Sequence, residues 1–451
     1  MNKKLVALAA IVIIIIASVA IYYATLPPPA QPPEEKPPPP PEKPPPAPVT
    51  LELWTSFAGE IPQEEFFNDF QKRISEKYPH ITLKVTHYVG KDFLPKLTSA
   101  MAAGAPPDIF VSYGGGQLKA LVDEGQVEDL TILLSEAWAK ELIPEGAKAS
   151  HTFAGKTYAL PYELNTAWLL INKKLFREAG VEIPAEAWTW DEFMDAVHKF
   201  RKKGIYPLTI SGNTPRHMVY HLDYLIERIA GQEKFIKTLN REPGYSFTDA
   251  QFVEAFKKFK ELVKADAFYP GAKGYGYMDA VASFGKGEAA MLCIYTWVVA
   301  PILKDFPDFE LDIINYPVVP GGAGGPEISG YTLGLAVAKG SKNKEAAFDV
   351  LRLFAQRDVM LEYARKTGNP IALNIEIPAG TLNPVSEKAY NLAKGATTFV
   401  YRKGTYMPPE LGSKYEEVVS KVFYGEMTPE QAVAELENKA KELKELGKLP
   451  M

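Results

Sequence analysis

VTLELWTSFAGEIPQEEFFNDFQKRISEKYPHITLKV, residues 49–85, contains a strand, a helix and a second strand in succession. Residues 49–54 alternate in polarity as a half-buried strand does, and residues 62–78 place their apolar side chains at helical spacing. A helix over residues 92–103 and a strand at Asp108–Ser112 continue the alternation. Strands that are joined by helices make right-handed crossovers, so this part of the chain predicts an α/β architecture with a largely parallel sheet.

Several polar and aromatic residues follow the strands of this predicted sheet. Trp54 and Ser56 close the first strand, and Tyr113 follows the third. In parallel sheets ligands meet the carboxyl ends of the strands, so these three residues are candidates for ligand contacts. The glycines at 114–116 do not predict a phosphate site, because no Lys-Ser or Lys-Thr pair follows them.

The beginning of the chain predicts export. Lys3 and Lys4 precede an uncharged apolar run, Leu5–Tyr23, which at helical rise nearly crosses a hydrocarbon core of about 30 Å. The positive-inside rule then puts the remainder of the chain outside the membrane. We expect residues 1–25 to be an anchor or a signal. A cleaved signal peptide, with small residues at Ser18–Ala20, and processing next to the lysines, as in archaeal pilin-like signals, remain as alternatives.

The next segment, residues 26–48, is composed almost wholly of Pro, Glu and Lys. Such a composition favours an extended polyproline II spacer and cannot build a core. We therefore expect a body that begins near residue 49 and lies at the extracellular face, tethered by the anchor or secreted if the leader is cleaved.

Composition limits what the body can be. The chain has 451 residues, a formal net charge of −5 and no long basic run, so nucleic acid is not an expected partner. About 400 residues exceed what one hydrophobic core usually serves, so two domains are expected. The only cysteine, Cys293, lies in an apolar run and is expected to be buried packing.

Catalytic and metal motifs are not found in the sequence. His217 and His221 have the spacing of a zinc-protease helix, but Met218 stands where that motif needs a glutamate. We expect no catalytic residue, no metal and no cofactor.

A set of short segments in fixed order resembles the maltose-binding-protein-like extracellular solute-binding proteins of ABC importers, family 1. The resemblance covers essentially all of Val49–Met451. It is carried by LWTS (53–56), PDIFV (107–111), LVDEG (121–125), GKTYALP (155–161), LINKKLF (170–176), TWDEF (189–193), FGKGEAAM (284–291) with Trp297, and GYTLGLAV (330–337).

The resemblance implies a two-lobed, periplasmic-binding-protein-like (type II) fold that closes around its ligand like a Venus flytrap. The first lobe would comprise residues 49–161 plus 327–375, and the second residues 162–326 plus 376–451. It also implies a receptor that is not an enzyme, acts as a monomer and is recognised by the membrane subunits of an ABC importer.

The same resemblance adds site residues to those at the strand ends. It places ligand contacts at Tyr162 and Asn165 in the first crossing between lobes, and at Trp297, Tyr331 and Tyr415. Aromatic rings and amides match the C–H faces and hydroxyl rims of sugars, so the expected ligand is a carbohydrate, in particular a di- or oligosaccharide. The alternatives are another small solute, such as a peptide or polyol, and a tethered glycan-cleaving enzyme.

Overall fold

The computed structural model describes residues 3–26, 47–394 and 399–449 in two compact units. The first unit contains helix α1 (Lys3–Thr25), in which Lys4–Thr25 is long and apolar enough to cross a membrane, a test that a signal sequence also passes. Almost all of the predicted proline-rich spacer falls outside the described residues. The body, from Pro48 onward, is the second unit.

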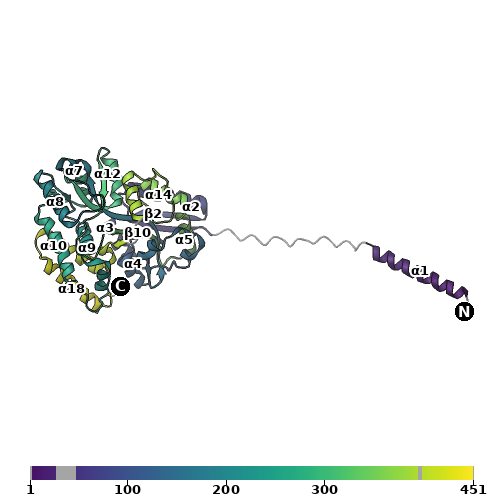
Figure 1. Cartoon of the computed structure of the whole chain (residues 1–451). Coiled ribbons are helices and arrows are strands. Elements are labelled where there is room, and N and C mark those ends of the chain that lie inside the picture. Colours follow the sequence, from purple (N-terminus) through teal and green to yellow (C-terminus); the bar gives the residue numbers. More distant parts are fainter. Residues whose placement is uncertain (1–2, 27–46, 395–398, 450–451) are drawn as a thin grey trace. The chain divides into compact units, whose positions relative to one another are not determined.

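The body begins with the predicted alternation of strands and helices (Figure 1). Strand β1 pairs in parallel with β2 and with β3, as expected. These first elements are β1 (Val49–Thr55), α2 (Ile61–Lys77), β2 (Ile81–His87), α3 (Gly90–Ala102), β3 (Ile109–Ser112) and α4 (Gly115–Asp123).

The central sheet is mixed: the parallel pairing predicted for the first strands is present there, but β3 is followed by antiparallel pairs. The strand order is β2-β1-β3-β10-β6-β8-β7, and β10 (Ile328–Val337) is antiparallel to both β3 and β6 (Leu160–Asn172). The sequence patterns of residues 156–161 and 167–172 predict two short strands, but these segments are largely one strand of 13 residues, β6. Its first half, residues 160–166, pairs with β10, a partner that is distant in sequence and therefore cannot be recognised from local patterns.

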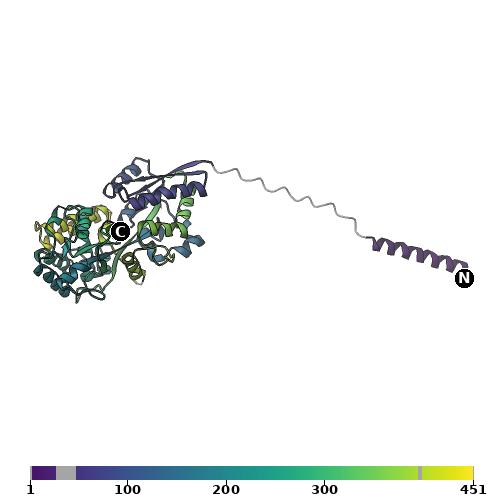
Figure 2. The ribbon, with the colours of Figure 1, turned by 90° about the horizontal axis from the view of Figure 1, so that it is seen from above.

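Two separate hydrophobic cores lie within the body. The first core takes its residues from Leu51–Tyr162 and Leu333–Leu382, and the second from Ala167–Ile328 and Val385–Leu449. Within the body, Figure 2 shows the purple and light-green elements in one group and the teal and yellow elements in another. The chain thus passes between the cores along β6, along β10 and near residue 383, which makes the body two-lobed.

The first core is completed by helices from distant parts of the chain. Helix α14 lies beside α2, and a small hairpin of β4 (Thr152–Phe153) and β5 (Lys156–Thr157) precedes β6. The remaining helices on this side are α5 (Ala137–Leu142), α6 (Glu145–Lys148), α13 (Lys344–Phe354) and α14 (Arg357–Thr367).

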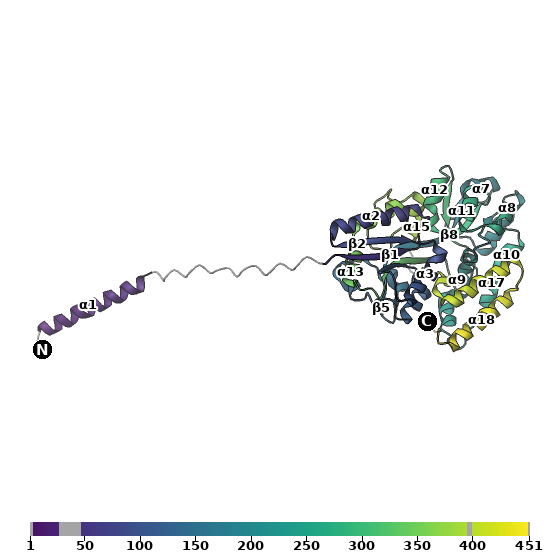
Figure 3. The same cartoon turned by 180° about the vertical axis from the view of Figure 1, so that it is seen from behind.

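The second core is rich in helices, in line with the helical spacing of apolar residues over 218–229, 249–263 and 415–422. Helices α17 (Pro409–Tyr424) and α18 (Pro429–Glu445) run alongside α10 (Ala250–Lys264) and are seen together in Figure 3. The other elements are α7 (Lys173–Ala179), α8 (Trp190–Lys202), β7 (Leu208–Thr209), α9 (Pro215–Leu239), α11 (Tyr277–Gly285), β8 (Met291–Tyr295), α12 (Val299–Asp305), β9 (Leu311–Ile314), α15 (Pro384–Lys394), β11 (Phe399–Tyr401) and α16 (Lys403–Tyr406). The apolar run of residues 313–319 predicts a strand, but β9 ends at Ile314.

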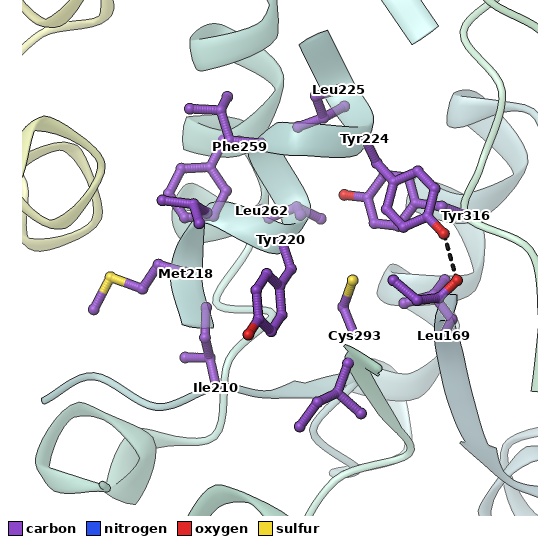
Figure 4. Packing of buried hydrophobic residues seen from close by; sticks show 14 of the residues in the cluster. Leu169, Ile210, Met218, Tyr220, Tyr224, Leu225, Phe259, Leu262, Cys293 and Tyr316 are labelled. Carbon is purple, nitrogen blue, oxygen red and sulfur yellow. Dashed lines mark hydrogen bonds between the residues drawn. The ribbon is translucent and has the colours of Figure 1, made fainter. Parts of the chain in front are cut away.

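Cys293 and the two spaced histidines are part of this second core. Figure 4 shows the Cys293 thiol enclosed by Tyr220, Tyr224 and Tyr316. Burial raises the pKa of the Cys293 thiol well above its ordinary value, so it is an unreactive packing group. His217 and His221 are fully buried; His217 contacts the backbone oxygen of Cys293 (3.1 Å).

Candidate functional site

The carboxyl ends of β1 and β3 bring Ser56 and Tyr113 together. Ser56 Oγ and Tyr113 Oη are 2.7 Å apart. Burial raises the pKa of Tyr113 to about 12, and the bond to Ser56 opposes this shift, so the phenol is neutral at pH 7. A neutral phenol that is partly exposed can both donate and accept hydrogen bonds with a ligand.

Strand β10 carries the next ring of the site. The centroid of Tyr331 lies 6.2 Å from that of Tyr113 and 5.0 Å from that of Tyr295. Tyr295 ends β8 and belongs to the second core, whereas Tyr113 packs against the first. Tyr331 therefore joins aromatic groups of the two cores.

Further rings continue the series on the side of the second core. Tyr220 lies edge-on to Tyr295 at 5.0 Å, and its hydroxyl is 3.0 Å from the hydroxyl of Tyr277. Tyr277 stacks on Trp297 at 5.3 Å with an interplanar angle of 24°. We call these six residues the aromatic cluster: Tyr113, Tyr331, Tyr295, Tyr220, Tyr277 and Trp297.

The exposure of the rings indicates which of them a ligand can touch. Tyr113, Tyr331, Tyr277 and Trp297 are partly exposed, whereas Tyr220 and Tyr295 are buried behind them. Flat, partly exposed rings backed by other rings form a rigid apolar surface with phenolic hydroxyls at its edges. Such a surface suits a ligand with apolar faces and many hydroxyls.

Asn165 adds an unpaired acceptor beside the aromatic cluster. It is paired with Tyr331 across the antiparallel strands β6 and β10, so both side chains lie on the same face of the sheet. Its Nδ2 donates to Glu163 Oε1 (2.5 Å), while its buried Oδ1 has no partner. A buried acceptor without a partner is costly, and a ligand hydroxyl would satisfy it.

Two carboxyl groups near this face are shifted towards their neutral forms. Burial raises the pKa of Glu163, which accepts hydrogen bonds from Tyr363 and from Asn369 (3.1 Å). Burial, together with Glu163 and Glu64, raises the pKa of Glu60 to about 8. Glu60 is partly exposed and precedes α2, so near neutral pH it presents a mostly protonated carboxyl group.

Two cavities of the body can be compared with this site, and Tyr331 of the aromatic cluster lines the smaller one. One of about 480 Å³ lies where α9 is interrupted at Gly231, next to Lys234 and Tyr245. The other, of about 320 Å³, includes Leu164 and Thr332, which are paired on the opposite face of β6 and β10 from Asn165. Trp297 and Tyr113 line neither of them.

The model of the family described as bacterial extracellular solute-binding protein matches residues 58–360. The chain belongs to this family. The sequence of this solute-binding protein is 29% identical over 322 residues to the diacetylchitobiose binding protein DasA of Streptomyces coelicolor, covering 67% of this chain and 68% of the relative. It is 26% identical over 305 residues to a putative binding protein of Brucella abortus, covering 67% and 71%.

Solved structures share the fold of this solute-binding protein. A chitin oligosaccharide binding protein superposes with a TM-score of 0.80 at 24% identity, covering 88% of this chain and 98% of the other. The raffinose complex of a binding protein named RafE gives 0.71 at 19% identity, covering 88% and 100%. The predicted family and the predicted two-lobed α/β fold are thereby confirmed.

The solute-binding protein brings together five of the eight residues named from its sequence. Tyr113, Tyr331 and Trp297 belong to the aromatic cluster, Ser56 bonds to it, and Asn165 lies on the same face as Tyr331. The other three contact other groups. They are Trp54, edge-on to Tyr88 at 4.9 Å; Tyr162, buried against Phe354 and Tyr363; and Tyr415, buried with its hydroxyl donating to Asp223 (2.9 Å).

Residues that the sequence did not single out complete the site. Tyr295 comes two residues before Trp297, so the prediction of Trp297 as a site residue could also have indicated Tyr295. Tyr220, Tyr277, Glu60 and Arg402 carry no local signal, because only the fold brings them to the aromatic cluster.

Among the described residues, no group of three or more His, Cys, Asp or Glu side chains could hold a metal ion.

Proposed function

We propose that this solute-binding protein is the receptor of an ABC importer for a carbohydrate, in particular a di- or oligosaccharide. The observation that carries the proposal is the aromatic cluster, whose partly exposed rings come from both hydrophobic cores. Sugar rings offer apolar C–H faces that stack on aromatic side chains, with hydroxyls at their rims. Ser56, Asn165 and the phenols supply the donors and acceptors for those hydroxyls.

The curated relatives point to the same ligand class. The Streptomyces coelicolor relative is a diacetylchitobiose binding protein, and a relative in Streptococcus mutans, 24% identical over 240 residues, is a multiple sugar-binding protein. These ligands belong to those proteins, and we carry over to this chain only the carbohydrate class.

Capture would proceed by closure of the two lobes. A ligand that touches rings of both cores binds the closed form better than the open form, and so shifts the population towards closure. The importer's membrane subunits would recognise the closed form. We retain the lobe boundaries 49–161 plus 327–375 and 162–326 plus 376–451; the positions where the cores change, on β6, on β10 and near residue 383, support boundaries close to these.

The N-terminal helix would place the receptor at the outer face of the cell membrane. The length and apolar composition of α1 suit a retained anchor, with two lysines on its cytoplasmic side. A tether would keep the receptor close to its importer at a raised effective concentration. We propose that the receptor acts as a monomer.

Isothermal titration calorimetry against a panel of ligands tests the proposal. The panel should contain chito-, xylo-, malto- and cello-oligosaccharides, with short peptides and polyols as competing classes. We expect heat from at least one carbohydrate. If no carbohydrate gives heat of binding and a peptide or polyol does, the ligand belongs to that other class.

A catalytic role is tested on the same sugars. After incubation with the protein, chromatography should recover each oligosaccharide intact. Cleavage that is abolished by Glu60→Gln or by Glu163→Gln would show an enzyme instead of a receptor.

Trp297 contributes a partly exposed ring to the aromatic cluster. Replacing its half-buried ring by alanine removes the stacking surface next to Tyr277, so Trp297→Ala should weaken carbohydrate binding at least about tenfold, or about 1.4 kcal/mol. Trp138→Ala is the matched control, because Trp138 is also half-buried but packs against the first core beside Glu136. Equal affinities of the two variants would remove Trp297 from the site.

A further inference from the structure

Arg402 is a buried cation within the aromatic cluster. Its guanidinium lies 5.1 Å from the ring centre of Tyr220 and 5.7 Å from those of Tyr295 and Tyr331. The residue is 7% exposed and directly precedes α16. Because Tyr331 is partly exposed, a ligand stacked on that ring would come within reach of the guanidinium.

The other deeply buried cations of the body have a structural role and can be compared with Arg402 by their ion-pair partners. Each of them has a carboxylate partner, as the cost of burying a charge requires. They are Lys403 with Glu227 (3.4 Å) and Arg228 with Glu327 (3.5 Å), and the partly exposed Arg241 likewise pairs with Glu437 (2.5 Å). By contrast, no carboxylate of the described residues lies within 4.0 Å of Arg402.

Asp223 is not the ion-pair partner of Arg402. Burial raises the pKa of Asp223 to about 6, while Lys403, the hydrogen bond from Tyr415 and the charge of Arg402 act in the opposite direction. Its Oδ1 accepts the Tyr415 hydroxyl, and its carboxylate lies beyond ion-pair distance of Arg402. Asp223 is thus electrostatically coupled to Arg402 without forming an ion pair with it.

Burial raises the pKa values of the two acids near this face, Glu163 and Glu60, which weakens their repulsion of an anion. Glu163 is buried and hydrogen-bonded to Tyr363, Asn165 and Asn369, and its pKa is raised by burial. The pKa of Glu60 is raised to about 8 by burial and by its acidic neighbours. Arg402 is therefore a cation that lies over three rings of the aromatic cluster, beside acids whose charge is weakened.

We propose that Arg402 selects a carbohydrate that carries a carboxylate, such as a uronic-acid-containing oligosaccharide. The inference rests on the proposed function and narrows its ligand class. The planar guanidinium presents paired N–H donors whose spacing matches the two oxygens of a carboxylate. The rings hold the guanidinium by cation–π contacts until the ligand supplies the missing anion.

Matched pairs of acidic and neutral sugars test the inference on the wild-type protein. The pairs are oligogalacturonate with its carboxyl-reduced form, and glucuronate-substituted with plain xylo-oligosaccharide. A sulfated and a plain chito-oligosaccharide form a third pair, which separates carboxylate from sulfate. We expect a carboxylate sugar to bind at least about tenfold more tightly than its neutral partner.

The possible outcomes separate the inference from the proposed function. If neutral sugars bind as tightly as carboxylate sugars, or only the sulfated sugar gains affinity, the inference is overturned while the sugar receptor stands. If no member of any pair and no sugar of the wider panel binds, both are overturned.

Substitutions at Arg402 test whether this residue causes the preference for carboxylate sugars. Arg402→Gln should lose at least about tenfold in affinity for the carboxylate sugar and less than about threefold for its neutral partner, with Arg402→Lys in between. Arg201→Gln is the control, because Arg201 also lies over a tyrosine ring, that of Tyr206 (4.0 Å), but is bonded to Asp266. Equal losses for both sugars would overturn the role of Arg402. If Arg402→Gln fails to fold, the affinities of the wild-type protein for the matched acidic and neutral sugars still test the inference.

Discussion

At the scale of single residues, Glu60 links stability to pH. Its pKa is raised from 4.5 to about 8, so the folded protein holds this proton more tightly than the unfolded chain does. The resulting stabilisation is full below about pH 4.5 and is lost as the pH rises through about 8. Thermal unfolding of ligand-free protein between about pH 5 and pH 9 should show a steeper loss of stability in wild type than in Glu60→Gln. Superimposable profiles would show that Glu60 ionises as an ordinary surface acid.

The single residues of the site also show how much of it could be predicted from the sequence. Ser56 and Tyr113 were predictable because they end neighbouring parallel strands, whose carboxyl ends share one edge. Trp54 ends the same strand, but the buried residues of β1 are Leu51, Leu53 and Thr55, so its ring leaves by the other face towards Tyr88. Tyr220, Tyr277 and Arg402 lie on three separate segments, and only the tertiary fold joins them to the site.

At the scale of elements, local signals were the most reliable. Thr428 before Pro429 and an amphipathic run predicts an N-cap, and the structure has a full capping box there. Thr428 Oγ1 accepts from Gln431 N (3.2 Å), and Gln431 Oε1 accepts from Thr428 N (2.9 Å). The continuity of β6 was not predictable, because it depends on pairing with β10. Thr428→Ala should lower the free energy of unfolding by about 1 kcal/mol in chemical denaturation and leave sugar affinity unchanged. A loss of affinity would instead couple α18 to the site.

Helix α4 and helix α16 meet between the two cores, and glycine permits this contact. A Cβ on Gly116 in α4 would overlap the carbonyl group of Met407, which follows α16 and belongs to the second core. If this contact belongs to the closed form, Gly116→Ala should weaken sugar binding at least about tenfold. Gly274→Ala is the control, because its added methyl would meet open space at a φ that other residues adopt. Unaltered affinity in Gly116→Ala would show that closure does not need this contact.

At the scale of the whole molecule, closure depends on the weak connection between two strong cores. Each core buries its own set of aliphatic and aromatic side chains, while few segments pass between them. Such a body can change the angle between its lobes without disturbing either core. A ligand that bridges the lobes must therefore change the distance between them, and this change is measurable apart from affinity.

Two spin labels can report that distance cleanly, because the only native cysteine, Cys293, is fully buried. We place cysteines at exposed Glu124, which ends α4, and exposed Ser413 on α17, since α4 and α17 lie in contact. Electron paramagnetic resonance should give a broad distance distribution without sugar and a shorter, narrower one at saturation. The same labels with the added change Gly116→Ala should stay broad. A distribution that does not respond to a sugar whose binding calorimetry has established would show a receptor that binds without closing.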